Sequence, residues 1–280
     1  MIFRAFYGVP QTTRARDGTL TNAVRGFVET LARLIFERRP GHVAVTTDED
    51  WRPDWRVELI PGYKVHRTAE PVPPLLIPQM PVIMDALEAV GVDALGKPDY
   101  EAEDIIASLV TRVKPPVEIV SGDRDLFSLI RDPDVRVLYP EKTGLSVIDE
   151  AEVARRYSIP GRAYGEFAIL RGDPSDGLPG IAGVGAKKAA DLVRKYGSVQ
   201  GMLDAGIFRD SDADYLARAQ RVVPPVGDLD IKVPAGRRGR YPVDAARVAE
   251  LGKRYGIDSS LQRLVKALET MGKTAPVTKS

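Results

Sequence analysis

Short β-branched runs alternate along the first half of the chain with segments whose apolar residues recur at helical spacing. The three runs occupy residues 42–47, 117–121 and 135–139. The three helical segments occupy residues 21–38, 79–90 and 101–113. Because β-branched runs favour strands and the 3.6-residue period favours helices, this alternation predicts a mixed α/β fold with a largely parallel central sheet flanked by helices.

The pattern changes near residue 149, where it becomes helical and punctuated by glycine. We expect helices at residues 150–157, 163–170, 186–196, 243–254 and 258–270, a basic Pro/Gly-rich stretch at 222–242, and a frayed tail after Met271. We therefore predict one domain over residues 1–150 and a helical subdomain over 151–280. The segment 51–78 has no clear period, and a loop of that length in a compact domain is usually functional.

The two predicted domains differ in charge. Residues 1–150 carry 18 basic and 24 acidic side chains, a net of −6, whereas residues 151–280 carry 22 and 15, a net of +7. This asymmetry indicates a first domain that holds cations and a second that holds anions. Chance variation in surface charge is the alternative explanation.

Composition limits the chemistry. The 44% hydrophobic content is enough for a substantial core. With no cysteine and two histidines, a metal must bind oxygen ligands, which favours Mg²⁺ or Mn²⁺. The sequence contains no secretory or membrane-spanning apolar segment, so we expect a cytoplasmic protein that does not bind membranes.

Eight carboxylates stand at the predicted ends of helices and strands. They are Asp48, Glu101, Glu103, Asp104, Asp123, Asp125, Asp173 and Asp176. In α/β sheets ligands bind beyond the carboxyl ends of strands, where Asp48 and Asp123 fall, and Gly122 permits the turn that lets Asp123 and Asp125 converge. Like charges this close need cations, and two cations about 4 Å apart can promote phosphodiester hydrolysis. Taken singly, each acid is also compatible with a helix-dipole partner or an ordinary turn.

Two basic segments suit a nucleic acid. Gly183 and Gly185 lead into a helix that begins with Lys187 and Lys188, an arrangement that binds phosphates without reading bases. An ordinary helix-turn-helix connection is the alternative. The basic and aromatic residues of the long loop could bind a single nucleic-acid strand near the metals. The alternative is an ordinary solvated, charged loop. These loop residues are Arg56, Tyr63, Lys64, His66 and Arg67.

Together these segments resemble the bacterial 5′ nuclease family, which includes flap endonucleases and the 5′→3′ exonuclease domain of DNA polymerase I. The resemblance runs from residue 1 to about 200, more loosely beyond. It rests on Arg4-Ala-Phe-Tyr, Thr21-Asn-Ala-Val, Tyr63-Lys64 with Arg67, Tyr100-Glu-Ala-Glu-Asp104, Ser121-Gly-Asp-Arg-Asp-Leu126, Gly172-Asp-Pro-Ser-Asp, Pro179-Gly and Gly183-Val-Gly185.

The resemblance implies two metal sites, one from the acids at 48, 101, 103 and 104 and one from those at 123, 125, 173 and 176. Residues 163–197 resemble the family's helix–three-turn–helix duplex-binding module, which a potassium ion often assists. Lys64 and Arg67 match residues that line the family's helical gateway, through which the 5′ single strand passes. Together with Arg4, they are the expected catalytic residues, which would stabilise the scissile phosphate.

Three departures from the family pattern stand out. The family's first apolar strand, which ends in Asp-Gly before the arginine that matches Arg4, is not in this sequence, so weaker metal binding at the first site is expected. Glu103 replaces an Asp, which shifts a carboxylate by one methylene. Gly177 stands where the family often has Asn, and we expect little consequence.

The sequence therefore predicts a monomeric, standalone nuclease that cuts 5′ flaps and 5′ ends of DNA with two or more Mg²⁺ or Mn²⁺ ions. One alternative is a non-catalytic protein that binds branched DNA, because the first strand's acid is missing. Another is a haloacid dehalogenase-like phosphatase, in which Asp123 would be a covalent nucleophile.

Overall fold

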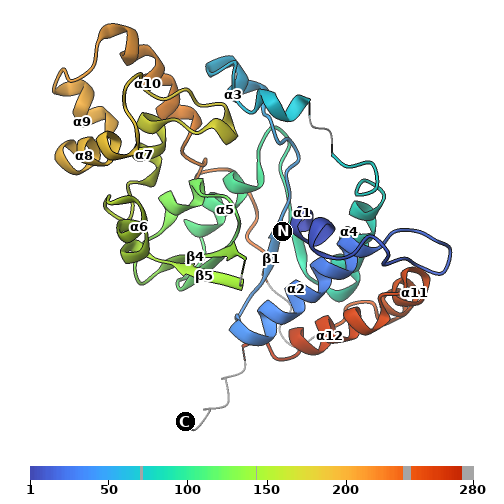
Figure 1. Ribbon diagram of the computed structural model, residues 1–280. Helices are drawn as coiled ribbons and strands as arrows, with labels where there is room; N and C mark the ends of the chain where they lie inside the picture. Colours follow the sequence, from blue (N-terminus) through green and yellow to red (C-terminus); the bar gives the residue numbers. More distant parts are fainter. Residues whose placement is uncertain (70–71, 143, 236–240, 273–280) are drawn as a thin grey trace. The chain divides into compact units, whose positions relative to one another are not determined.

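The computed structural model describes residues 1–69, 72–142, 144–235 and 241–272. The chain forms two compact units (Figure 1). Unit 1 comprises Met1–Val45, Pro71–Leu95 and Pro234–Ser280, and unit 2 comprises Thr46–Glu70 and Gly96–Val233. The division at residue 150 stays a prediction. Residues 273–280 of the predicted frayed tail and positions 236–240 of the basic stretch lie outside the described residues.

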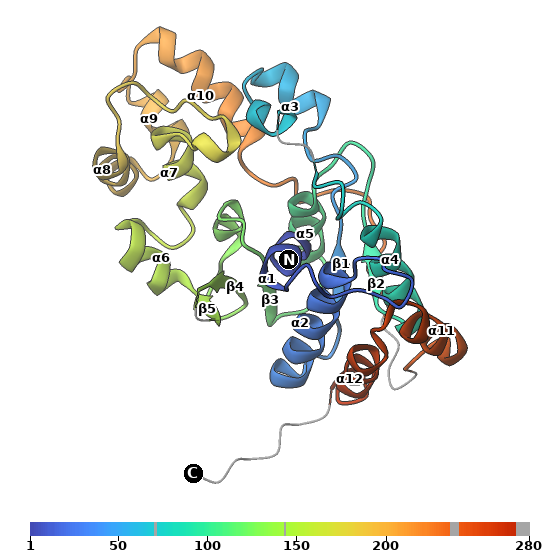
Figure 2. The same cartoon turned by 45° about the vertical axis from the view of Figure 1, so that its right-hand side comes forward.

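Unit 1 is mainly helical. Its elements are α1 (Ile2–Gly8), α2 (Asn22–Arg38), the greater part of β1 (Ala44–Thr46), α4 (Gln79–Val90), β2 (Asp93–Leu95), α11 (Ala245–Tyr255) and α12 (Asp258–Leu268). The apolar stripe of α2 is buried against α4 and α12, in one core with residues of α11, and Val24, Val28 and Ile35 are almost fully covered. The four helices predicted in these segments are confirmed. Both views show α2 beside α12 (Figures 1 and 2).

Unit 2 contains a small sheet and the remaining helices of the described residues. Its elements are α3 (Asp54–Leu59), η1 (Val65–Thr68), α5 (Ala102–Val110), β3 (Val117–Val120), η2 (Asp125–Leu129), β4 (Val135–Glu141), β5 (Gly144–Ile148), α6 (Glu150–Tyr157), α7 (Tyr164–Arg171), η3 (Pro174–Asp176), α8 (Ala186–Tyr196), α9 (Val199–Asp204) and α10 (Asp210–Val222). Strand β4 pairs in parallel with β3 and antiparallel with β5. Their inward side chains, among them Ile119, Val137 and Ile148, form one core with Phe127 and Phe167.

The structure confirms a mixed α/β fold with helices flanking the sheets, but the strands fall into two small sheets. Strands β1 and β2 pair with each other, apart from β3, β4 and β5. A three-residue strand such as β1 forms few hydrogen bonds with a neighbour. The β-branched run in the sequence therefore does not show which strand pairs with it. Among the described residues, no helix is long and apolar enough to cross a membrane.

The predicted long loop at 51–78 is wrong in part, because it contains α3 and η1. Six residues make fewer than two helical turns, too short for a hydrophobic period to appear in the sequence. These two elements matter for function because they carry Arg56 on α3, Lys64 just before η1 and Arg67 within it.

Candidate active site

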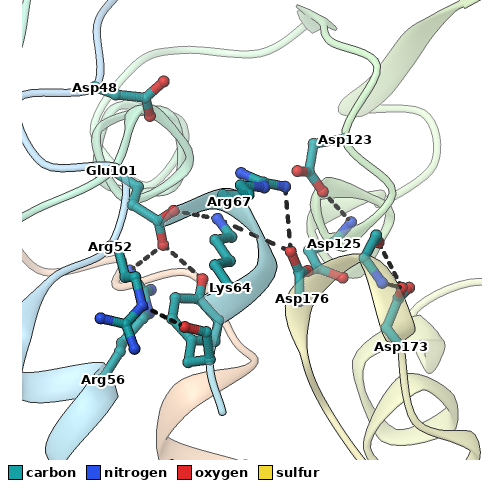
Figure 3. Close-up of polar contacts among 12 residues, drawn as sticks. Asp48, Arg52, Arg56, Lys64, Arg67, Glu101, Asp123, Asp125, Asp173 and Asp176 are labelled. Atoms are coloured by element: carbon teal, nitrogen blue, oxygen red, sulfur yellow. Dashed lines mark hydrogen bonds and ion pairs between the residues drawn. The ribbon is translucent and has the colours of Figure 1, made fainter. Parts of the chain in front are cut away.

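The predicted acids of unit 2 lie on two sides of a pair of basic residues (Figure 3). The basic pair is Lys64 and Arg67. One side holds Asp48 and Glu101, and the other holds Asp123, Asp125, Asp173 and Asp176. Turns at the starts of α5, η2 and η3 supply most of these carboxylates, so acids far apart in sequence share one region.

Glu101 and Asp104 are neutralised by buried basic side chains. Arg56, 3% exposed, forms a two-pronged pair with Asp104, with Nη1 to Oδ2 at 2.8 Å and Nη2 to Oδ1 at 2.7 Å. Its Nη1 also donates to Glu101 Oε2 at 2.8 Å, and the Tyr63 hydroxyl donates to the same oxygen at 2.6 Å. The ammonium of Lys64 donates to Glu101 Oε1. Two carboxylates thus share two cations.

The burial of Arg56 corrects its predicted role as a DNA contact. The guanidinium is enclosed by Glu101, Asp104 and the carbonyl of Val222, to which Nε donates at 3.2 Å. Removing one partner of such a pair leaves an uncompensated buried charge, which costs about 3–5 kcal/mol. Arg56 therefore organises the site from behind and is not available to a strand passing over the surface.

Glu103 is the acid that the protein itself leaves least satisfied. Its Oε2 atom is buried and has no hydrogen-bond partner among the described residues. Burial, followed by repulsion from Asp123, raises the pKa of Glu103 well above its ordinary range, and Asp48 acts in the same direction. Glu103 therefore faces the acids of the opposite side, Asp123 and Asp125.

Asp123 and Asp125 form a tight turn at the end of β3. The Asp125 backbone N–H donates to Asp123 Oδ1 at 2.9 Å, and the Asp123 N–H donates to Ser121 Oγ at 3.1 Å. Gly122 does not adopt the left-handed conformation, so these side-chain hydrogen bonds make the turn. Burial, then repulsion by Asp123 and Asp176, raises the pKa of Asp125 well above its ordinary range.

Asp176 links the basic pair to this turn. Its Oδ1 lies 3.5 Å from Arg67 Nη2 and 4.0 Å from Lys64 Nζ. Burial raises the pKa of Asp176 even though Lys64 opposes the shift. The side chain of Arg67 is 39% exposed, so this guanidinium can reach a ligand from solvent while it stays close to the acid.

Asp173 and Asp48 have structural partners of their own. Asp173 Oδ2 accepts from Arg124 at 3.2 Å and from Arg171 at 3.3 Å, while its Oδ1 caps η3 through Ser175. Asp48 is exposed, and its Oδ1 accepts from the Ala102 N–H at 2.8 Å. It therefore holds the first turn of α5.

The eight acids thus divide by how the protein neutralises them. Glu101, Asp104 and Asp173 each contact two or more charged or polar donors. Glu103 and Asp125 are pressed against other carboxylates and lack a basic partner within hydrogen-bonding distance in the described structure. A small cavity is lined by Lys64, Glu101, Glu103, Asp123 and Asp125 among others. A positive charge in this cavity would offset the repulsion among its carboxylates.

The turn after Asp176 depends on a close approach of two glycines. Gly177 has φ +68°, and a Cβ there would lie 2.0 Å from the carbonyl oxygen of Gly62. This contact accompanies a hydrogen bond from the Lys64 N–H to the Asp176 carbonyl at 3.0 Å. The expectation that Gly177 has little consequence is wrong, because its missing side chain lets the Lys64 segment reach the Asp176 turn.

Gly177→Ala should therefore lower the free energy of unfolding by more than the backbone strain at a positive φ would by itself. Gly206 has φ +65° with nothing within 4 Å of its Cβ position, so Gly206→Ala is a matched control that costs about 1 kcal/mol. Urea unfolding should give Gly177→Ala an additional loss of about 2 kcal/mol or more. Equal losses in the two variants would show that the approach of the two turns relaxes freely.

The predicted phosphate-binding residues lie at the start of α8. Gly183, Gly185, Lys187 and Lys188 are all exposed, and a Cβ at either glycine would meet open space. The α8 N–H groups therefore face solvent, as anion binding requires. Helices α7 and α8 pack together.

The sequence did not single out several residues that shape the site. Arg124 and Arg171 hold Asp173, and the Val226 N–H donates to Asp104 at 2.8 Å. Arg124 stands within the Asp-Arg-Asp motif, which is the one sequence signal for it. The Val226 contact joins residues 122 positions apart and has no sequence signal.

The donor set fits a hard divalent cation. Within the described ranges, no group of three or more Asp, Glu and His side chains is arranged to hold a metal ion, and Lys64 and Arg56 instead hold the start of α5. The unpartnered Glu103 oxygen and the mutual repulsion of the acids are what a bound cation would relieve. Carboxylate clusters of this kind can hold the cations of metal-dependent phosphodiester hydrolases.

Comparison with known proteins identifies the family. Residues 1–158 match the 5′-3′ exonuclease N-terminal resolvase-like domain, and residues 159–217 match the 5′-3′ exonuclease C-terminal SAM fold. The chain is 42% identical to a 5′-3′ exonuclease of Streptomyces coelicolor, covering 96% of this chain and 97% of the relative. It is 43% identical to one of Mycobacterium tuberculosis, covering 97% and 96%.

A solved structure shares the fold. It is a flap endonuclease of bacteriophage T5 in a complex with DNA and metal ions, with a TM-score of 0.63, 16% identity, and coverage of 88% of this chain and 91% of that chain. The chain belongs to the 5′-3′ exonuclease family, and is a nuclease. The resemblance drawn from the sequence motifs is confirmed.

Proposed function

We propose that this nuclease is structure-specific, cutting 5′ flaps and 5′ ends of DNA with two or more divalent cations. The observation that carries the proposal is the group of acids that the protein leaves without counter-charge, centred on Glu103, Asp123 and Asp125. The flap endonuclease structure that shares the fold contains DNA and metal ions, which supports the same substrate and cofactor class here.

Mg²⁺ or Mn²⁺ would be held by acids from both sides of the site. The candidate ligands on the first side are Asp48, Glu101, Glu103 and Asp104, and those on the second side are Asp123, Asp125, Asp173 and Asp176. Glu103, Asp123 and Asp125 would be direct ligands, because they have the fewest competing partners. Bound ions of this kind supply Lewis-acid polarisation of the phosphate and a water that ionises more readily.

Lys64 and Arg67 would stabilise the negative charge that develops on the scissile phosphate. Both lie between the two groups of acids (Figure 3), and Lys64 is 4% exposed, so its charge acts in a poorly solvated region where it has a large effect. Burial opposes its charge, but Glu101, Glu103 and Asp176 outweigh this and raise the pKa of Lys64. A catalytic role for Arg4 stays a prediction from the family resemblance.

Duplex binding would fall to the α7–α8 pair. The exposed N-terminus of α8 offers backbone N–H groups, and Lys187 and Lys188 add sequence-independent charge. We propose residues 151–280 as the DNA-binding region, with 163–197 as the helix–three-turn–helix module, and residues 1–150 as the metal-binding region. Assistance by K⁺, a monomeric state and a cytoplasmic location also stay predictions.

The test is cleavage of a labelled 5′-flap duplex with Mn²⁺, with Mg²⁺ and with chelator, beside a matched 3′-flap duplex. The proposed function predicts cuts near the 5′-flap junction that require metal, and much slower cutting of the 3′ flap. Binding of both duplexes without cleavage under all three conditions would favour the branched-DNA-binding alternative. Release of phosphate from small phosphate esters, with intact DNA, would favour the phosphatase alternative.

A further inference from the structure

An extended segment after α10 is bound along one face of α5. This segment, Val223–Ile231, is called the strap below. The face of α5 and its C-terminal end is formed by Asp104, Ser108, Thr111 and Arg112, whose spacing of three to four residues places them on one side of a helix. Each of these side chains makes a hydrogen bond with the strap backbone.

The contacts cover most of the length of the strap. Ser108 Oγ donates to the Val226 carbonyl at 2.9 Å and accepts from the Leu229 N–H at 3.1 Å. Thr111 Oγ1 donates to the Gly227 carbonyl at 3.0 Å, and Arg112 Nη1 donates to the Ile231 carbonyl at 2.7 Å. An otherwise irregular segment is therefore fixed mainly by side chains of α5 and its C-terminal end, and Lys97 Nζ adds a hydrogen bond to the Asp230 carbonyl at 3.5 Å.

Asp104 is where the strap meets the acid site. It is 0% exposed, and its carboxylate accepts from the Val226 N–H at 2.8 Å, from both Nη atoms of Arg56 and from the Glu101 N–H at 3.1 Å. These four donors use the lone pairs that a metal would need. Glu103, one residue earlier, has an oxygen with no partner in the described structure.

We infer that Asp104 is a positioning residue, which joins Arg56 and the strap to the first turn of α5 and so sets Glu101 and Glu103 for the cation. The inference rests on the proposed metal-dependent function. It assigns different roles to two neighbouring acids: Asp104 holds the start of α5, and Glu103 faces the cation. It also gives the strap a role, because the Val226 N–H donates to Asp104.

The first test is the sign of the stability change in metal-free protein. Asp104→Asn leaves Arg56 buried without its full counter-charge, so the Tm should fall by about 6 °C or more. Glu103→Gln removes a charge that faces Asp123 and Asp48, so its Tm should stay level or rise. If Asp104→Asn behaves like Glu103→Gln, Asp104 is a member of the repelling acid group and the inference is wrong.

The second test uses Ser108→Ala, which loosens the strap without touching an acid and keeps the inference testable if Asp104→Asn does not fold. Hydrogen exchange of the strap amides should increase, and Mn²⁺ affinity measured by calorimetry should fall about tenfold, with unchanged flap-DNA affinity in chelator. The matched control is Ser146→Ala on β5, which should leave Mn²⁺ affinity unchanged.

The outcomes separate the inference from the proposed function. If wild-type protein binds no Mn²⁺, the metal-dependent function itself fails. If wild-type protein binds Mn²⁺ and Ser108→Ala binds it equally well, with unchanged strap exchange, only the positioning role fails. A purely structural strap would show faster exchange in Ser108→Ala with wild-type Mn²⁺ affinity, and that result would also overturn the inference.

Discussion

Asp125→Asn should abolish DNA cleavage while leaving DNA binding intact. The carboxylate lies beside Asp123 and Asp176, and burial together with these neighbours raises its pKa. A cation nearby would offset this repulsion and favour the ionised carboxylate. Asn keeps the size of the side chain and removes the charge, so several kcal/mol of metal-derived stabilisation should be lost. That corresponds to a decrease in kcat of roughly 10³-fold or more, measured on a labelled 5′-flap duplex with Mn²⁺.

Binding and stability should move differently from turnover in this variant. Flap-DNA affinity in chelator should stay within about twofold of wild type, and the metal-free Tm should stay level or rise, because a repelling charge is gone. Glu58→Gln is the matched control, an exposed acid on α3 that should leave all three quantities unchanged. Wild-type turnover in Asp125→Asn would refute the two-sided acid site, whereas joint loss of cleavage and binding would indicate a folding defect.

The sequence located the acids well because their positions depend on local structure. Asp123 and Asp125 follow a β-branched run, and Asp173 and Asp176 occupy a Gly-Asp turn, so strand ends and turns were recognisable from neighbouring residues. The helices at 79–90 and 186–196 were found at their observed bounds because their apolar periods span several turns. The 5′ nuclease motifs then fixed the family.

The sequence could not show which acids the protein neutralises by itself. Arg56 pairs with Asp104 across 48 positions, and nothing near Arg56 distinguishes a buried guanidinium from one on a solvated loop. The pairing of β1 could not be predicted for the same reason. Its partner is β2, which follows α3, η1 and α4 in the chain. Such long-range contacts decide whether a charged residue binds substrate or supports the residues that do.

Lys64→Met should reduce turnover strongly and should also destabilise the metal-free protein. The ammonium donates to Glu101 and lies 4.0 Å from Asp176 Oδ1, so its loss leaves two carboxylates with one cation fewer. The phosphate would also lose a positive charge in a poorly solvated region, for which a decrease in kcat of about 10²- to 10³-fold is expected. Flap-DNA affinity should change only a few-fold, because surface residues supply most of the phosphate contacts.

The sign of the stability effect distinguishes Lys64 from the acids. Because the folded-state pKa of Lys64 is raised above its ordinary value of 10.5, its stabilising contribution is fully present below that value and is lost only as pH rises through the folded pKa. At pH 7 the metal-free Tm of Lys64→Met should therefore fall, opposite to Asp125→Asn.

Adding Mn²⁺ should raise the Tm of Lys64→Met more than that of wild type, because the metal then replaces the missing cation. Lys142→Met, at an exposed lysine in the same unit, is the control. If Mn²⁺ raised the Tm of Lys64→Met less than that of wild type, Lys64 would be supporting metal binding instead of occupying its place, and the charge balance proposed for the site would be wrong.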